Sequence, residues 1–294
     1  MNWLTDPLLS HGFFRHGLAA GLLGGALCGL VGVFVVLKRM SYIGHGLSHA
    51  IFGGAAVAYV LNANFYLGAG AWGFLSALLI NGVARRRKIG ADAAIGVVTT
   101  ASFAIGVWLI SSVHRFTVNL EAALFGNILG VTLEQIYVLI GVLVVIAAII
   151  FLRYRQLLFA TFDPEAADAY GVNVRRSETV LALMLAATIV ATMQALGVTL
   201  IAATIVVPAV IARLLTDSFA RMLVWSTTIG AVAGVVGMYV SYYWNPPPGA
   251  AIVLILAGVF ALVYLGTAIT GRRRLRVLDA ETHTDVAGPA VLEH

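Results

Sequence analysis

Two histidines four residues apart carry the most distinctive chemistry in the sequence. His45 and His49 lie in segment 40–50, MSYIGHGLSHA, inside a long apolar stretch. On a helix, side chains at positions i and i+4 share one face about 6 Å apart, close enough to bind one metal ion. An ionisable side chain inside such a stretch is costly and indicates function. The alternative is that one imidazole bonds a backbone carbonyl and the other lies at the membrane interface, and the pair alone leaves both readings open.

A second pattern predicts a short helix within a polar loop. Asp163 can cap the start of a helix, Pro164 suits its first position and Glu165 complements its dipole. Gly171 can end the helix in the left-handed conformation. Segment 163–171 is therefore predicted to be a helix that lies across the membrane surface. By itself, this pattern favours an ordinary amphipathic connector.

The composition requires these residues to sit in a membrane protein. Of the 294 residues, 61% are hydrophobic and only 11% are charged, against about 25% charged residues in soluble proteins. At about 20 residues per helix, the apolar residues supply roughly nine transmembrane spans and leave no soluble catalytic domain. The single cysteine, Cys28, excludes an intrachain disulfide and is expected to be a small core residue.

Six long stretches without charged residues mark the spans. Three of them exceed the length of one crossing, and each has a break near its middle, so each predicts a helical hairpin. The breaks are Asn62-Ala63-Asn64, Gly197 and Asn245-Pro246-Pro247-Pro248-Gly249. The stretches are 17–37, 40–84, 93–113, 135–152, 179–212 and 222–271.

Basic residues predict the orientation, because cytoplasmic loops are rich in Lys and Arg. All of the 18 Lys and Arg residues except Arg15 and Arg115 fall in six clusters between the stretches. Placing the clusters inside gives about nine helices (eight to ten), an outside N-terminus, and one permease domain over 1–271. Residues 272–294 form a predicted cytoplasmic tail, in which 292–294 resemble a cloning scar. The net charge of +5 is thereby explained without a nucleic-acid partner.

The absence of other motifs favours transport over catalysis. The sequence has no Walker-type phosphate loop, no His-Glu-x-x-His and no Gly-x-Ser-x-Gly. Its acidic residues lie at span ends or in loops, whereas proton-coupled carriers usually bury them in the bundle. The driving energy is therefore expected to come from elsewhere. Glycines at small-xxx-small spacing, Gly21/Gly25/Gly29 and Gly230/Gly234, predict close helix packing, within the chain rather than between subunits.

Taken together, these motifs resemble the membrane subunits of the ATP-binding-cassette (ABC) importers for zinc, manganese and iron. Segment 40–50 is similar to the family pattern Met-Ser-x-x-Gly-Asp-Ala-x-Ser-His-Ala, and 162–167 to the coupling-loop pattern Phe-Asp-x-Glu-x-Ala. Further similar segments are 92–96, 124–129 and 196–215. The coupling residues that the resemblance implies are Phe162, Asp163, Pro164, Glu165, Ala166 and Ala167.

The resemblance implies a homodimeric permease in a bacterial or archaeal cytoplasmic (inner) membrane. Its implied partners are a dimer of cytoplasmic ATPase subunits and an extracytoplasmic metal-binding protein, with no permanently bound cofactor. His49 keeps the family histidine, whereas His45 stands where the family usually has aspartate. Imidazole binds zinc well and manganese or iron acceptably, while a carboxylate favours harder ions, so this difference favours zinc slightly over manganese as the transported ion.

Two other functions use the same histidines. An ATP-independent metal carrier or channel would need them equally but would need no coupling helix and no ATPase. An intramembrane metalloenzyme would need a third ligand and a general base, and His114 and Glu121 are predicted to lie on the outer side, too far away to serve.

Overall fold

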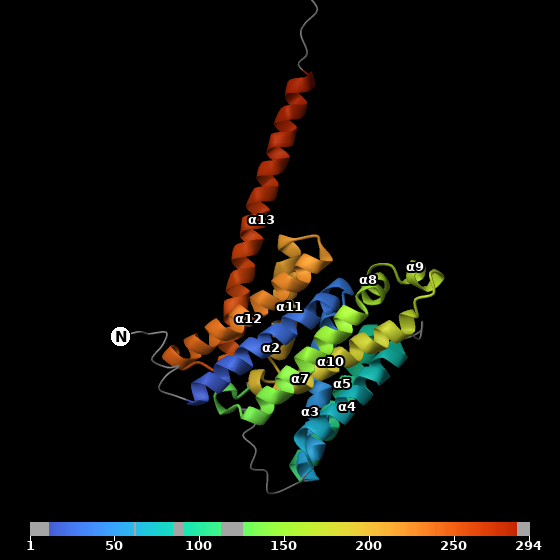
Figure 1. Cartoon of the computed structure of the whole chain (residues 1–294), viewed down its shortest axis with the longest axis vertical. Coiled ribbons are helices and arrows are strands. Elements are labelled where there is room, and N and C mark those ends of the chain that lie inside the picture. Colours follow the sequence, from blue (N-terminus) through green and yellow to red (C-terminus); the bar gives the residue numbers. More distant parts are fainter. Residues whose placement is uncertain (1–11, 62, 85–90, 113–125, 287–294) are drawn as a thin grey trace, which may run out of the picture.

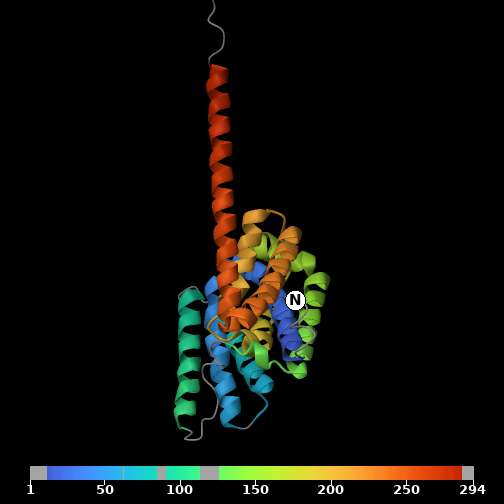
Figure 2. The same ribbon diagram turned by 90° about the vertical axis from the view of Figure 1, so that its left-hand side faces the viewer.

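Figures 1 and 2 show a computed structural model of the chain, which describes residues 12–61, 63–84, 91–112 and 126–286. Within these ranges the regular structure is entirely helical, which confirms the predicted all-α fold. The elements are α2 (Gly12–Leu37), α3 (Ser41–Val60), α4 (Phe65–Ala84), α5 (Ala91–Ser112), η1 (Ile128–Gly130), α7 (Leu133–Leu152), α8 (Tyr154–Phe162), α9 (Pro164–Ala169), α10 (Val174–Leu196), α11 (Ile201–Leu215), α12 (Phe219–Trp244) and α13 (Pro248–Val286).

The three predicted hairpin breaks are confirmed. Helix α3 gives way to α4 across residues 61–64. Helix α10 ends at Gly197, whose φ of 84° lies in the left-handed region that favours glycine. Helix α12 ends at Asn245, with φ of 61°, and the prolines that follow restart the chain as α13. Each break therefore follows from the local backbone chemistry of the residues that mark it.

The predicted number of long helices is also confirmed. In the part of the chain that the structure describes, nine helices have 15 or more residues. Six of them are long and apolar enough to cross a membrane: α2, α4, α7, α10, α12 and the first 22 residues of α13. Helix α11, with 15 residues, is about 22 Å long, which is less than the hydrocarbon thickness of about 30 Å.

Helix α13 differs from its prediction at the C-terminal end. Its apolar part ends at Ile269, but the helix continues to Val286 across the start of the predicted tail. Figure 1 shows it projecting far beyond the other helices. The Arg-, Leu-, Ala- and Glu-rich sequence 272–281 consists mostly of good helix formers, so loss of hydrophobicity does not end the helix. Residues 287–294, including 292–294, lie outside the described residues.

The centre of the bundle is a backbone contact between α2 and α12. A Cβ atom at Gly21 would lie 2.8 Å from the carbonyl oxygen of Gly234, and one at Gly25 would overlap the carbonyl oxygen of Gly230. Ser226 Oγ donates a hydrogen bond of 2.6 Å to the carbonyl oxygen of Gly29. The glycine spacing therefore serves packing within the chain, as predicted, because only residues without a side chain allow the two backbones to come so close.

We expect Gly25→Ala to destabilise the bundle by about 1–3 kcal/mol, because the added methyl group forces the two backbones apart. Thermal unfolding of the detergent-solubilised protein measures the effect. Gly141→Ala in α7 is the matched control, since a Cβ at Gly141 meets no atom within 4 Å. Equal melting temperatures for Gly25→Ala and Gly141→Ala would contradict the packing role of this contact.

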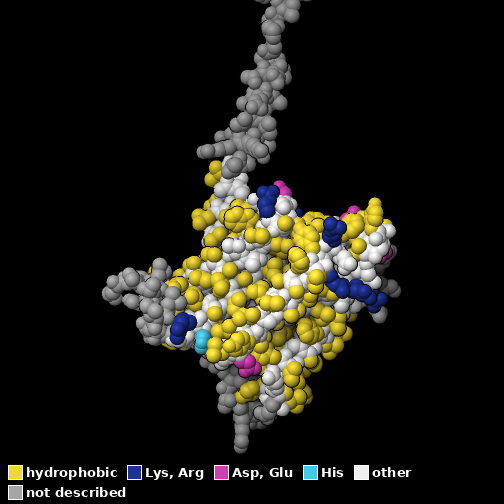
Figure 3. All heavy atoms as spheres, in the orientation of Figure 1, with side chains coloured by type: hydrophobic (Ala, Val, Ile, Leu, Met, Phe, Trp, Pro, Cys, Tyr) yellow, Lys and Arg dark blue, Asp and Glu magenta, His cyan; other side chains and the backbone are white. Residues whose placement is uncertain are grey.

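The two ends of the bundle differ in their charged and polar residues. On the face shown in Figure 3, most of the side chains coloured as Lys or Arg lie over the end where α8 and α11 are labelled in Figure 1. At this end Lys38 Nζ lies 3.3 Å from Glu178 Oε1. At the other end, the Tyr66 hydroxyl donates to Gln194 Oε1 at 3.1 Å, and the Asn127 amide donates to the Gln194 carbonyl at 3.0 Å. The two ends match the predicted inner and outer sides of the membrane.

The orientation itself is a prediction that thiol labelling can test. Cysteines at Asn64 and Asn245, between helices at the predicted outer end, should react with an impermeant thiol reagent added to intact cells. A cysteine at Ser218, between α11 and α12, should react only after the membrane is opened. The background is Cys28→Ala, whose replaced side chain is fully buried. Labelling of Ser218→Cys in intact cells would reverse the orientation.

Candidate metal site

Helix α3 brings the two predicted metal ligands together. The ring centroids of His45 and His49 lie 4.7 Å apart at an angle of 76°. The side chain of His45 is exposed and that of His49 is half-buried. A metal bound through an imidazole nitrogen lies about 3 Å from the ring centroid, so two neighbouring ligands of one ion place their centroids about 5 Å apart. The helix therefore already holds both rings at a separation that suits a shared ion.

The neighbouring helix α5 sets the position of this face. A Cβ at Gly53 would overlap the carbonyl oxygen of Ser102, and one at Gly106 would lie 2.7 Å from the Cα of Gly53. This close approach brings Phe103 of α5 against His49, with ring centroids 5.5 Å apart at 89°. One side of the His49 ring is thus fixed by packing, whereas His45 on the turn before it is free of this contact.

The hydrogen bonding around the pair bears on the alternative interpretation. Ser48, which lies between the histidines, donates its hydroxyl to the His45 carbonyl at 2.8 Å. In the described part of the chain, neither imidazole forms a hydrogen bond of its own. The expected alternative, in which one imidazole bonds a backbone carbonyl, is therefore not what this structure contains, and the ring nitrogens remain available to a ligand.

The described residues offer two candidate ligands at this place, His45 and His49. Among the residues that the structure describes, no group of three or more His, Cys, Asp or Glu side chains could hold a metal ion. His114 and Glu121, considered above for a metalloenzyme, lie outside the described residues. Cys28 is fully buried in α2, as expected for a core residue. Within the described residues, the histidine pair therefore has no third ligand of these types beside it.

The predicted short helix is α9, and its caps have the predicted chemistry. Asp163 Oδ1 accepts a hydrogen bond of 2.9 Å from the Ala166 amide, and Pro164 occupies the first turn. At the other end, Gly171 has φ of 79°, and the Val172 amide donates to the Ala167 carbonyl at 2.9 Å. These bonds satisfy the free backbone groups at both ends, so α9 is held rigidly despite its six residues.

The side chains of this loop are not all available to a partner. The side chains of Phe162, Asp163, Pro164 and Glu165 are exposed and that of Ala166 is partly exposed, whereas Ala167 is 0% exposed. Ala167, one of the coupling residues that the resemblance implies, therefore offers no exposed side chain to a partner, because its methyl group is fully buried. Burial of this kind depends on how α9 folds back, which the motif does not reveal.

The sequence analysis also missed helix α8, which joins α7 to α9. Leu157 and Ala160 of α8 are buried, and Phe162 at its end packs against Phe219 at the start of α12, with centroids 6.1 Å apart. Leu157 and Ala160 are three positions apart and so share one face of a helix, which is the local signal for α8 in the sequence. The loop that carries α9 is therefore a packed two-helix unit seated on the bundle.

Comparison with known proteins shows which family the chain belongs to. A family model described as the ABC 3 transport family matches residues 10–267. The manganese transport system membrane protein MntC of Halalkalibacterium halodurans is 36% identical over 264 residues, which cover 90% of each protein. The manganese import system permease protein ScaB of Streptococcus parasanguinis is 34% identical and covers 94% of this chain and 98% of ScaB.

A solved structure shows the same architecture. PsaBC from Streptococcus pneumoniae, determined in complex with Fab, matches with a TM-score of 0.80 and 33% sequence identity over 88% of this chain and 93% of the other. Sequence and structure thus agree over most of the length. The chain is a multi-pass helical protein of the bacterial inner membrane and belongs to the ABC 3 transport family.

Proposed function

We propose that this chain is the permease subunit of an ABC importer for divalent transition-metal ions. The observation that carries the proposal is the contact between the imidazole rings of His45 and His49 on one face of α3. The manganese transporters among its relatives support the same substrate class. Two imidazoles held this close together can serve as ligands of one metal ion.

The transient nature of transport fits the two candidate ligands found among the described residues of the chain. A closed shell of four ligands would trap the ion, whereas two ligands bind it weakly. In a two-fold homodimer, the exposed His45 and the half-buried His49 of each protomer would supply up to four imidazoles near the axis. We therefore propose a homodimer in which the ion is held briefly between the protomers and then released.

The identity of the ion rests on two opposing arguments. Replacement of a carboxylate by the His45 imidazole favours zinc, a softer ion, over manganese. Relatives that share about a third of their residues over nearly the whole chain are named as manganese transporters. The similarity to manganese transporters extends over nearly the whole chain, whereas His45 is a single ligand. We therefore propose that manganese is the principal ion and that the His45 imidazole also allows zinc to be transported.

The energy for import is proposed to come from a pair of cytoplasmic ATPase subunits docked on α9. The capped ends of α9 and the exposed side chains at its start, Phe162, Asp163, Pro164 and Glu165, fit a contact that must transmit force. An extracytoplasmic metal-binding protein would deliver the ion to the opposite end. Membership of an ABC transport family supports this arrangement over an ATP-independent carrier, which would need neither partner.

We expect His49→Ala to abolish ATP-dependent manganese uptake, because one imidazole per protomer cannot hold the ion. Uptake of radioactive manganese into proteoliposomes containing the permease, its ATPase and its binding protein is the measurement. His45→Asp should keep transport and raise the ratio of manganese to zinc imported. The matched control is His16→Ala in α2, which removes a partly buried histidine away from the pair. Full uptake by His49→Ala would make the pair a packing feature, since edge-to-face ring contacts have the same spacing.

Reversing a charge on the exposed surface of α9 should uncouple the ATPase. We expect Glu165→Arg to lower ATP-driven uptake several-fold while costing α9 only about 0.3–1 kcal/mol through the lost helix-dipole interaction. Uptake and ATP hydrolysis are measured in the same proteoliposomes. Asp217→Arg, in the loop between α11 and α12, is the control, because Asp217 is an exposed acidic residue on a different loop. Wild-type uptake by Glu165→Arg would favour the ATP-independent carrier.

A further inference from the structure

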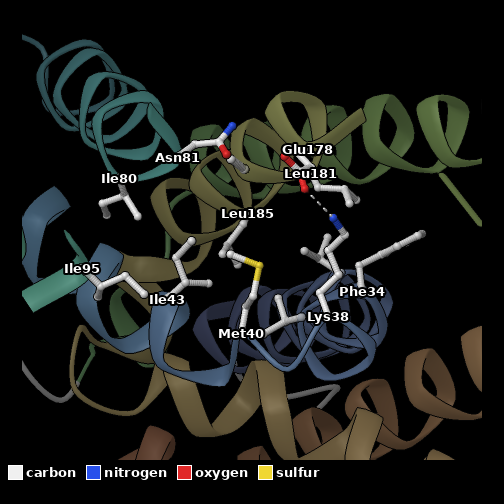
Figure 4. Close-up of a pocket in the computed structure, with 13 residues that line it drawn as sticks. Phe34, Lys38, Met40, Ile43, Ile80, Asn81, Ile95, Glu178, Leu181 and Leu185 are labelled. Carbon is white, nitrogen blue, oxygen red and sulfur yellow. Dashed lines mark hydrogen bonds and ion pairs between the residues drawn. The ribbon is translucent and has the colours of Figure 1, made fainter. Parts of the chain in front are cut away.

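A cavity at the predicted inner end of the bundle separates the histidine helix from α10. It has a volume of about 180 Å³ and is lined by residues of α2, α3, α4, α5 and α10 and of the turn between α2 and α3. Most of the lining is apolar, and Figure 4 shows Lys38, Glu178 and Asn81 as its polar side. Protein interiors are normally close-packed, and a space of this size is an exception. The helices around it can therefore shift relative to one another without steric obstruction.

An ion pair bridges the cavity. Lys38 Nζ lies 3.3 Å from Glu178 Oε1, and the two side chains are 13% and 31% exposed. In Figure 4 the two side chains approach each other from α10 and from the end of α2. A pair with this little exposure is screened weakly by solvent, so its attraction is stronger than that of a fully exposed pair. The pair therefore resists separation of the two helices at this point.

Lys38 is rigidly joined to the helix that carries the histidines. Helix α2 ends in a tight turn in which the Arg39 amide donates to the Val36 carbonyl at 3.0 Å and the Met40 amide to the Val35 carbonyl at 2.9 Å. Arg39 has φ of 55°, and α3 begins two residues later. These two bonds are the pattern that closes a helix end firmly. A displacement of Lys38 is thus passed to the start of α3.

Glu178 is joined in the same way to the loop that carries α9. Only residues 170–173 separate α9 from α10. The Asn173 side chain caps α10 by accepting from the Arg176 amide at 2.9 Å. The Val172 amide closes α9 through the Ala167 carbonyl at 2.9 Å. A movement of α9 therefore reaches Glu178 without passing through a flexible linker.

The outer half of α10 is held differently. There a Cβ at Gly24 of α2 would lie 3.6 Å from the side chains of Thr192 and Leu196, which is ordinary van der Waals contact. Helix α10 is thus packed directly on α2 at its outer end, while at its inner end the cavity intervenes and the ion pair spans it. This arrangement suits a helix that tilts about its packed outer end.

We propose that Lys38 and Glu178 are a positioning pair that passes movement of the α9 loop to the histidine pair on α3. The inference rests on the proposed function. Pulled by α9, Glu178 moves with α10, and its attraction for Lys38 draws the end of α2 and the start of α3 along. The two charges touch neither the ion nor the ATPase; they determine when His45 and His49 are brought into position.

The test compares ATP hydrolysed per manganese ion imported, in proteoliposomes with the full permease, its ATPase and its binding protein. We expect Glu178→Gln and Lys38→Met each to raise this ratio about fivefold, a size typical of coupling between sites, with ATP hydrolysis retained. The exchange Lys38→Glu/Glu178→Lys should restore the ratio to within about twofold, since the attraction returns although both helix dipoles then oppose it. Asn81→Leu, which alters the same cavity without removing either charge, should keep the wild-type ratio.

A covalent bridge provides a second test that does not depend on the exchange folding. In a Cys28→Ala background, Lys38→Cys/Glu178→Cys should show the raised ratio, and joining the two thiols with a short bifunctional reagent should lower it again. A wild-type ratio in Glu178→Gln, a raised ratio in Asn81→Leu, or no recovery in the bridged protein would overturn the inference and leave the proposed function intact. Absence of ATP-dependent import by the wild-type protein would overturn both.

Discussion

The contact between the backbones of α2 and α12 is the constraint on which the arrangement of the bundle depends. In lipid there is no hydrophobic gain from bringing two apolar helices together, so association rests on close packing and on hydrogen bonds between helices. Gly25 and Gly230 allow the close packing, and Ser226 Oγ provides the hydrogen bond between helices by donating to the Gly29 carbonyl. With α12 held on one side, α2 presents its other sides to α10 and α11, at Gly24 and at Gly32.

The candidate site is built by a second contact of the same kind. Gly53 and Gly106 let α3 and α5 approach until a Cβ on either would clash. The approach places Phe103 against His49 and leaves His45 exposed. Small residues thus do more than permit packing in this chain, because they also decide which face of the histidine helix is covered and which is left for a partner.

The features that could be predicted from the sequence are those with local causes. The caps at Asp163 and Gly171 and the break at Gly197 depend on residues within one turn, and each has its predicted geometry. The contact between Lys38 and Glu178 joins residues 140 positions apart. The local sequence pattern around either residue does not predict it. The burial of Ala167 is equally a result of packing. The metal-ligating role of His45 and His49 and the coupling role of 162–167 stay predictions, because they concern an ion and a partner.

The short helix α11 has a consequence for how the chain responds to its bilayer. Its length falls about 8 Å short of the hydrocarbon thickness, and unpaired backbone groups facing lipid at that depth would cost several kcal/mol each. Protein supplies the missing length: Val198 and Ile201 are completely buried, and the Asn127 amide bonds the Gln194 carbonyl beside the break. Helices α7 and α13, by contrast, leave most of their surface open. A change in membrane thickness is therefore expected to tilt α7 and α13, which face the lipid. The turn between α10 and α11 is surrounded by protein and does not have to adjust to that change.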